Sequence, residues 1–174
     1  MSISMSSASL PIFSTGLRNL KHCLEKGMAS AAQRNFSADV LVNVRLAPDM
    51  LPLASQVRIA CDAAKLCVAR VGGLEAPRHE DNETTMAQLC QRIDSTLAFL
   101  DSVPAAALDG SEAKEISFPV GRERVMRVMK GEAYLKHWAL PNFFFHITTA
   151  YALLRHNGVD LGKVDYLMGA QAQA

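Results

Sequence analysis

Apolar residues recur every three or four positions in four long stretches of this sequence, and that spacing places them on one face of a helix. It predicts helices over residues 9–32, 50–71, 83–100 and 131–157. On the third stretch, Gln88, Gln91, Arg92 and Asp94 form the expected solvent-facing side. Helices that are each apolar on one face must bury those faces against one another. The predicted fold class is therefore all-α, an antiparallel four-helix bundle.

The segment before the last helix has a different pattern. Residues 114–128 alternate between apolar and polar side chains around Gly121, which predicts a short β-hairpin. Pro119 restricts its strand to an edge or a bulge. Pro141 lies inside the last apolar stretch, so that helix should kink there or begin a new segment. Residues 159–174 are predicted to be a loop.

Composition limits the classes of protein that this chain can be. With 49% hydrophobic and 20% charged residues among 174, it is long and apolar enough for one globular domain spanning 1–174. A net charge of +1 without any basic block argues against nucleic acid as a partner. No apolar run approaches a membrane span, and the first residues lack a signal-peptide pattern. We expect a cytoplasmic protein with buried, unpaired cysteines, forming a homodimer.

One stripe of the last helix is the candidate binding site. Asn142, His146 and Thr149 fall on one helical face between apolar residues, and buried polar groups need partners. Aromatic residues, Tyr151 among them, flank this patch and could form the walls of a small-molecule pocket. The alternative is a core histidine that is simply hydrogen-bonded. His22 is expected at the surface and His79 in a solvated linker. Motifs for nucleotide binding or hydrolase triads are absent.

Several separated motifs resemble a known family. The sequences LAPDM at 46–50, QVRIACD at 56–62, DNETT at 81–85 and LPNFFFH at 140–146 occur in the same order in it. The chain resembles the DinB/YfiT-like four-helix-bundle superfamily and, more closely, a family of unknown function within it. The resemblance covers Leu10 to Leu167 and implies the same bundle fold.

The resemblance also implies where a metal would be bound. Metal-binding members use one histidine on the second helix and an HxxxH pair on the last. Here His146 occupies the second position of the pair, Asn142 the first, and Gln56 is the nearest inward polar residue on the second helix. One imidazole with neutral amides is a poor ligand set for a transition metal. We therefore expect no cofactor, with zinc or nickel at His146 as the less favoured alternative.

Three functional hypotheses follow. The first is a metal-free protein that binds a small molecule or a protein partner on a DinB-like bundle with a degenerate metal site. The second is a metal- or thiol-dependent transferase or hydrolase that acts on a small electrophile, with His146 in its pocket. The third assigns the patch a structural role, with Asn142 and His146 hydrogen-bonded to each other. Neither the ligand nor the pathway follows from the sequence.

Overall fold

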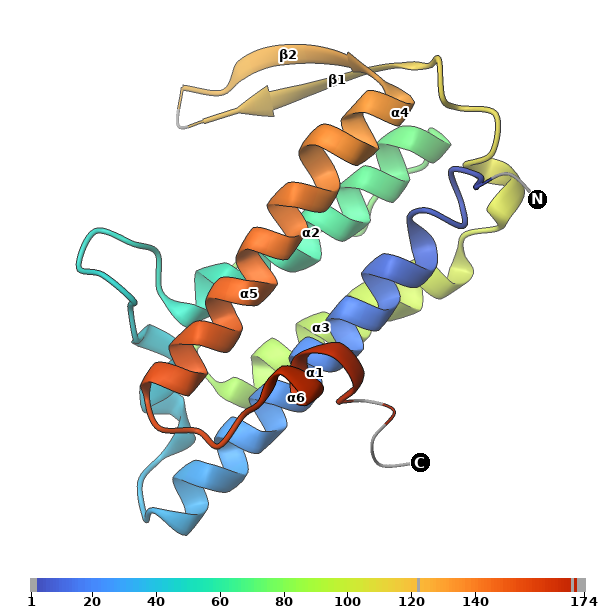
Figure 1. The fold of residues 1–174 in the computed structure, drawn as a ribbon. Helices are drawn as coiled ribbons and strands as arrows, with labels where there is room; N and C mark the ends of the chain where they lie inside the picture. Colours follow the sequence, from blue (N-terminus) through green and yellow to red (C-terminus); the bar gives the residue numbers. More distant parts are fainter. Residues whose placement is uncertain (1–2, 122, 170, 172–174) are drawn as a thin grey trace.

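Four long helices form the bundle in the computed structural model, which describes residues 3–121, 123–169 and 171 (Figure 1). They are α1 (Leu10–Gln33), α2 (Leu53–Gly72), α3 (Met86–Ser102) and α5 (Leu140–His156). The residues of the predicted apolar stripes line the core; Phe13, Leu17 and Leu24 of α1, for example, are fully buried. Short 3-10 turns at Ala38–Asn43 and Ala105–Ala107 lie in the connections. The all-α prediction is confirmed.

Contacts between helices define the chain directions. α1 runs antiparallel to α3, since Arg18 pairs with Asp101 and Lys21 with Asp94. α2 runs antiparallel to α5 and parallel to α3, because Gln56 bonds His146 while residues 58 and 62 contact residues 83 and 92. α1 and α5 are also parallel, with Phe13 against Phe143. Each helix therefore has one antiparallel neighbour, and the linker at 73–85 carries the chain back along the bundle.

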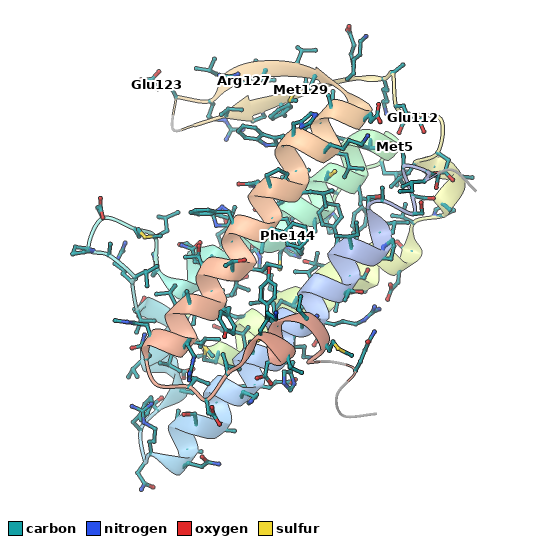
Figure 2. All side chains as sticks on the ribbon, viewed as in Figure 1. Met5, Glu112, Glu123, Arg127, Met129 and Phe144 are labelled. Atoms are coloured by element: carbon teal, nitrogen blue, oxygen red, sulfur yellow. The ribbon has the colours of Figure 1, made fainter. Side chains whose placement is uncertain are left out.

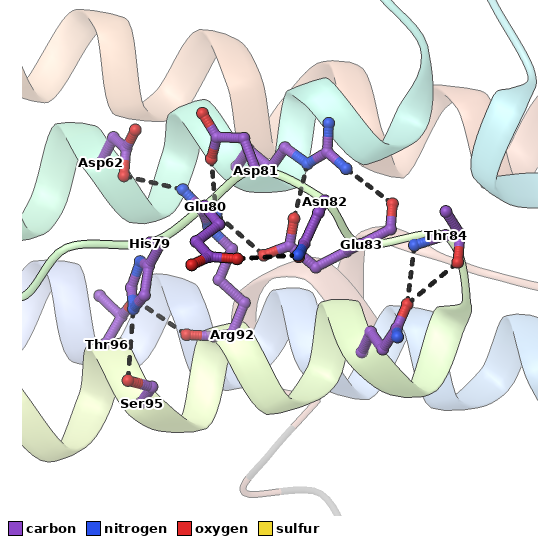
Figure 3. Close-up of polar contacts among 12 residues, drawn as sticks. Asp62, His79, Glu80, Asp81, Asn82, Glu83, Thr84, Arg92, Ser95 and Thr96 are labelled. Carbon is purple, nitrogen blue, oxygen red and sulfur yellow. Dashed lines mark hydrogen bonds and ion pairs between the residues drawn. The ribbon is translucent and has the colours of Figure 1, made fainter.

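A buried ion-pair network fixes that linker (Figure 3). The Arg92 side chain on α3 is only 1% exposed and pairs with Asp62 at 2.9 Å, Glu83 at 2.9 Å and Asp81 at 2.7 Å. Arg58 of α2 also binds Glu83, at 2.7 Å. The prediction that Arg92 faces solvent is wrong, because the returning linker covers that face of α3 and supplies the carboxylates that a buried guanidinium requires.

The predicted hairpin is present and crosses the end of the bundle where the last helical segment begins (Figure 1). β1 (Glu115–Val120) pairs antiparallel with β2 (Val125–Lys130), and Pro119 lies opposite Met126. Because the sheet has only two strands, Pro119 is at an edge, as its missing N–H requires. Ile116 and Phe118 point into the protein, whereas β2 is almost entirely exposed.

The last long helix is interrupted before its proline. A short α4 (Gly131–Tyr134) leads into a π-helical turn, Leu135–Ala139, and then into α5. The N–H of Leu140 donates to the carbonyl of Leu135, five residues back. Pro141 then lies in the first turn of α5, where its missing N–H costs little. The predicted break is confirmed, and a π-turn provides it.

The prediction of a loop after residue 158 is wrong in part, because α6 (Lys163–Met168) lies beside α1 (Figure 1). Asp165 accepts the N–H of Gly162 at 2.7 Å and pairs with His22 at 3.0 Å and Lys26 at 3.0 Å. His22 is consequently buried under α6 and not at the surface. Residues 170 and 172–174 of the tail prediction lie outside the described residues. No helix in the described part of the chain is long and apolar enough to cross a membrane.

Candidate functional site

His146 and Gln56 form a buried hydrogen-bonded pair between α5 and α2. His146 Nδ1 lies 2.7 Å from Gln56 Oε1, and Gln56 Nε2 donates to the carbonyl of Leu51 at 2.9 Å. Both side chains are buried. The antiparallel contact of α2 with α5 brings the two residues together from 90 positions apart. Asn142 is not the partner of His146, so the hypothesis of an Asn142–His146 bond is wrong.

The geometry defines the protonation of His146. Because the Gln56 amide nitrogen already donates to Leu51, its oxygen faces His146, and His146 Nδ1 must carry the proton. Burial lowers the pKa of His146 from 6.5 to about 4, so the imidazole is neutral at pH 7. Its Nε2 has no hydrogen-bond partner among the described residues and is not sealed from solvent. The site therefore offers one free imidazole lone pair.

The other predicted pocket residues occupy different surroundings. Thr149 is buried, but its hydroxyl donates to the carbonyl of Phe145 at 2.7 Å within the same helix. Tyr151 faces α1 and α6, where its ring packs edge-on against Tyr166 with centroids 5.8 Å apart. Neither of these two hydrogen-bonds to Gln56 or lines the cavity between α2, the hairpin and the π-turn. Asn142 is half-buried and does line that cavity.

A cavity of about 560 Å³ lies between α2, the hairpin and the π-turn. It reaches Asn142 and Ile59, each one helical turn from the His146–Gln56 pair. That volume is typical of small-molecule sites. The rest of its lining comes from the same elements, namely Asp62, Ala63, Leu66, Arg70, Phe118, Pro119, Val120, Gly121, Arg124, Tyr134, Trp138 and Ala139.

Sequence reasoning missed the polar end of this cavity. Arg70 Nη1 donates to the Tyr134 hydroxyl at 2.8 Å, and the Phe118 ring lies 4.7 Å from Tyr134 and 5.2 Å from Trp138 between centroids. Burial raises the pKa of Tyr134 and keeps it a neutral phenol. The enrichment of aromatic residues in the C-terminal third was a signal, but the pairing with α2 that adds Arg70 depends on tertiary structure.

The residues at the expected metal position do not fit a transition metal. His146 offers a single nitrogen, both polar atoms of the Gln56 amide are in hydrogen bonds, and Asn142 is a neutral amide. Across residues 3–121, 123–169 and 171, no three His, Cys, Asp or Glu side chains gather where they could hold a metal ion. A stable zinc or nickel site needs three or four strong donors.

The cysteines are also poorly suited to nucleophilic chemistry. All four are free and buried. Burial raises the pKa of the Cys23, Cys61 and Cys67 thiols to about 12 and that of Cys90 to about 11. Since the thiolate is the reactive form, none of these groups is an activated nucleophile at neutral pH. They act as small apolar side chains in the core.

Comparisons with known proteins agree with this fold. Residues 5–167 match the family described as a domain of unknown function, DUF1993. The crystal structure of a DinB family member protein from Shewanella denitrificans superposes with a TM-score of 0.84 at 42% identity, covering 93% of this chain and 90% of that one. No curated protein matches. The chain therefore belongs to the DUF1993 family and, with it, to the DinB family.

Proposed function

We propose that this protein is a metal-free small-molecule-binding protein, and that its ligand occupies the cavity between α2, the hairpin and α5. The observation that carries the proposal is the His146–Gln56 bond of 2.7 Å beside a cavity of about 560 Å³. A residue that could have been a metal ligand is instead held as a neutral hydrogen-bonding group. Asn142, one turn from His146, lines this aromatic cavity, and a neutral polar group there is suited to orienting a ligand.

An enzymatic role for His146 is the second candidate. Its Nε2 has no hydrogen-bond partner among the described residues and is not sealed from solvent, as a general base requires. However, burial lowers its pKa to about 4, well below the value near 7 that suits proton abstraction at neutral pH. Among the described residues, no carboxylate hydrogen-bonds to this imidazole to raise that pKa again. These observations favour binding over acid–base catalysis.

Elemental analysis of the untagged, chelator-free protein tests the metal-free part of the proposal. We expect no stoichiometric zinc or nickel in the wild type or in His146→Ala. The matched control is His156→Ala, which removes an exposed histidine at the end of α5. Stoichiometric metal that is lost in His146→Ala but kept in His156→Ala would refute the proposal and favour a metalloenzyme.

A thermal-shift screen of small molecules tests the binding part. A ligand that binds only the folded chain raises its melting temperature by an amount that grows with the logarithm of its concentration over Kd. We expect hits whose effect weakens in Asn142→Ala, because Asn142 lines the cavity, and persists in Asn157→Ala at the far end of α5. Hits that are indifferent to Asn142 would place the ligand elsewhere and contradict the proposal.

We also propose a cytoplasmic homodimer. Four unpaired cysteines suit a reducing compartment. Exposed apolar side chains on β2, including Met126 and Val128, and Phe144 on α5 (Figure 2) support self-association, because water disfavours such surfaces. Light scattering after size exclusion should give twice the chain mass of 18.9 kDa at micromolar concentration. A concentration-independent monomer would contradict the dimer without affecting the proposed ligand site.

A further inference from the structure

We propose that the cavity binds an organic anion, whose carboxylate or phosphate is held by Arg70 while its flat apolar body lies against Trp138, whose ring is supported from the core side by Phe118. This inference rests on the proposed small-molecule-binding function and adds the chemical class of the ligand. The three residues come from α2, β1 and the π-turn and line the same cavity. The inference depends on the charge of Arg70 being available, on the other charges around the cavity, and on the aromatic wall.

Arg70 has no acidic partner in the part of the chain that the structure describes. Its Nη1 donates to the Tyr134 hydroxyl at 2.8 Å, and this phenol is neutral because burial raises its pKa. The hydrogen bond therefore orients the guanidinium without neutralising it. Only one of the five N–H donors is used in this way, and the planar fork of the others matches a carboxylate or phosphate.

The ordinary structural role for Arg70 is already filled by another residue. An arginine in the last turn of a helix often serves the free carbonyls there. In α2 this role belongs to Lys114, whose Nζ donates to the carbonyls of Arg70 at 3.1 Å and Val71 at 3.0 Å. The Arg70 side chain extends instead over the cavity wall, with its Cζ 5.8 Å from the Phe118 ring centroid.

The other charges at the cavity leave it positive. Arg124, in the hairpin turn, also lines the cavity and forms no ion pair among the described residues. Asp62 is the one acid among the described lining residues, but its carboxylate is held by Arg92 at 2.9 Å and by Lys65 at 3.0 Å. Two unpaired guanidinium groups facing one neutralised carboxylate favour an anionic ligand over a cationic one.

The apolar wall determines the other half of the ligand. Phe118 is fully buried and packs against both Tyr134 and Trp138, so it supports the Trp138 ring from the core side. Trp138 is only partly covered and keeps a face open to the cavity. A flat aromatic or short aliphatic body fits against this surface, since rings stack with offset or edge contacts. Asn142 at the far end could bind a neutral polar substituent.

Trp138 makes the inference testable by fluorescence, because it is the only tryptophan of the chain. We would titrate the full-length protein with 3-phenylpropionate, its neutral amide 3-phenylpropionamide, and the cation 3-phenylpropylamine. These probes share one apolar body and differ in charge. We expect the carboxylate to change the Trp138 emission at a concentration at least about tenfold lower than the amide, because charge-assisted hydrogen bonds contribute more than neutral ones. Phenyl phosphate should also bind more tightly than the amide. Tighter binding of phenyl phosphate than of the carboxylate would identify a phosphate site.

Arg70→Gln should abolish this preference, so that carboxylate and amide bind equally, while Arg155→Gln, an exposed change at the end of α5, should keep it. Raised salt should weaken binding of the carboxylate by the wild type but should not weaken binding of the amide. A merely structural Arg70 would lower the melting temperature without altering charge preference. Equal binding of the three probes by wild type, or an unchanged preference in Arg70→Gln, would overturn the inference alone. Silence from every probe up to tens of millimolar would overturn the proposed binding function as well.

Discussion

Acid should destabilise this protein through His146, and the structure gives the size of the effect. The imidazole is buried and neutral, with Nδ1 bonded to Gln56 and a pKa lowered to about 4 from the ordinary 6.5. Because the folded-state pKa is below the unfolded one, the unfolded chain binds more protons between these values. The stability that neutral His146 contributes is therefore complete above pH 6.5 and declines as the pH falls toward 4.

The magnitude follows from the linkage relation. Each pKa unit of difference corresponds to about 1.4 kcal/mol, so protonating the unfolded chain removes at most roughly 3 kcal/mol by pH 4. At pH 5 the loss from His146 alone is about 2 kcal/mol relative to pH 7.5. This is a large part of the net stability of an ordinary domain, which is about 5 to 15 kcal/mol.

Urea unfolding at pH 7.5 and pH 5 measures this loss, and a variant that cannot titrate isolates it. His146→Gln keeps a donor for the Gln56 oxygen but has no pKa in this range, while every other ionisable group stays the same. We expect the wild type to lose about 2 kcal/mol more than His146→Gln between the two pH values. The control His156→Gln, at an exposed position, should follow the wild type.

Parallel pH dependence of wild type and His146→Gln would refute the reasoning, because it would mean that His146 titrates alike in both states. An NMR titration of the imidazole gives an independent check. The expected signal is a neutral ring protonated on Nδ1 throughout the range from pH 7 to pH 5. A ring that gains its second proton near pH 6.5 would show that its environment in solution is not the buried one described above.

Two further predictions concern packing. Arg92→Gln should cost about 1.5 to 3 kcal/mol in urea unfolding, because it removes charge-assisted bonds of a buried side chain while Asp62 keeps Lys65 and Glu83 keeps Arg58. Arg18→Gln, in an exposed ion pair, should cost less than about 1 kcal/mol; equal losses would contradict the burial of Arg92. Gly16→Ala would place a methyl group 2.6 Å from a Phe143 ring carbon and should lower stability by about 1 to 3 kcal/mol. Gly27→Ala, whose methyl would lie 3.2 Å from a Leu154 methyl, should cost less than Gly16→Ala, because its closest contact is longer and alanine favours helix.

Periodicity predicted the helices well because each helix carries its apolar residues on one face. Packing of that face in the core then stabilises the helix. It could not predict the chain directions. Parallel packing of α2 on α3 depends on a linker that returns along the bundle, and the linker is held by Asp81 and Glu83 on Arg92. A charged residue on an amphipathic helix is expected to face solvent, so Arg92 was predicted to be exposed although it is buried. α6 was missed because it is only one and a half turns long and is held by Asp165 contacts with a distant helix.

The candidate site was predictable in part for the same reason. His146 and Gln56 could be singled out because each is a polar residue on an apolar face, and the structure brings them together. Thr149 satisfied the same pattern but bonds the preceding turn of its own helix, which threonine does readily. Arg70 gave no such signal, because an arginine in the last turn of a helix has an ordinary explanation. In the structure Lys114, 44 residues away, binds the carbonyls at the end of α2 instead, so the Arg70 side chain does not serve that role.

The neutral pair at 146 and 56 and the positive cavity beside it support a single physical account of this chain. In a metal centre, substrate charge is balanced by the ion and its ligands. Here the donors are neutral amides and one neutral imidazole, so an anionic ligand needs a cation from another source. Arg70 lies about three helical turns along α2 from Ile59, at the other end of the cavity, and a neutral phenol holds it in place. Arg70 thus supplies the positive charge that an ion supplies in a metal centre. For this reason the charge preference of the ligand, more than its shape, should discriminate between the hypotheses.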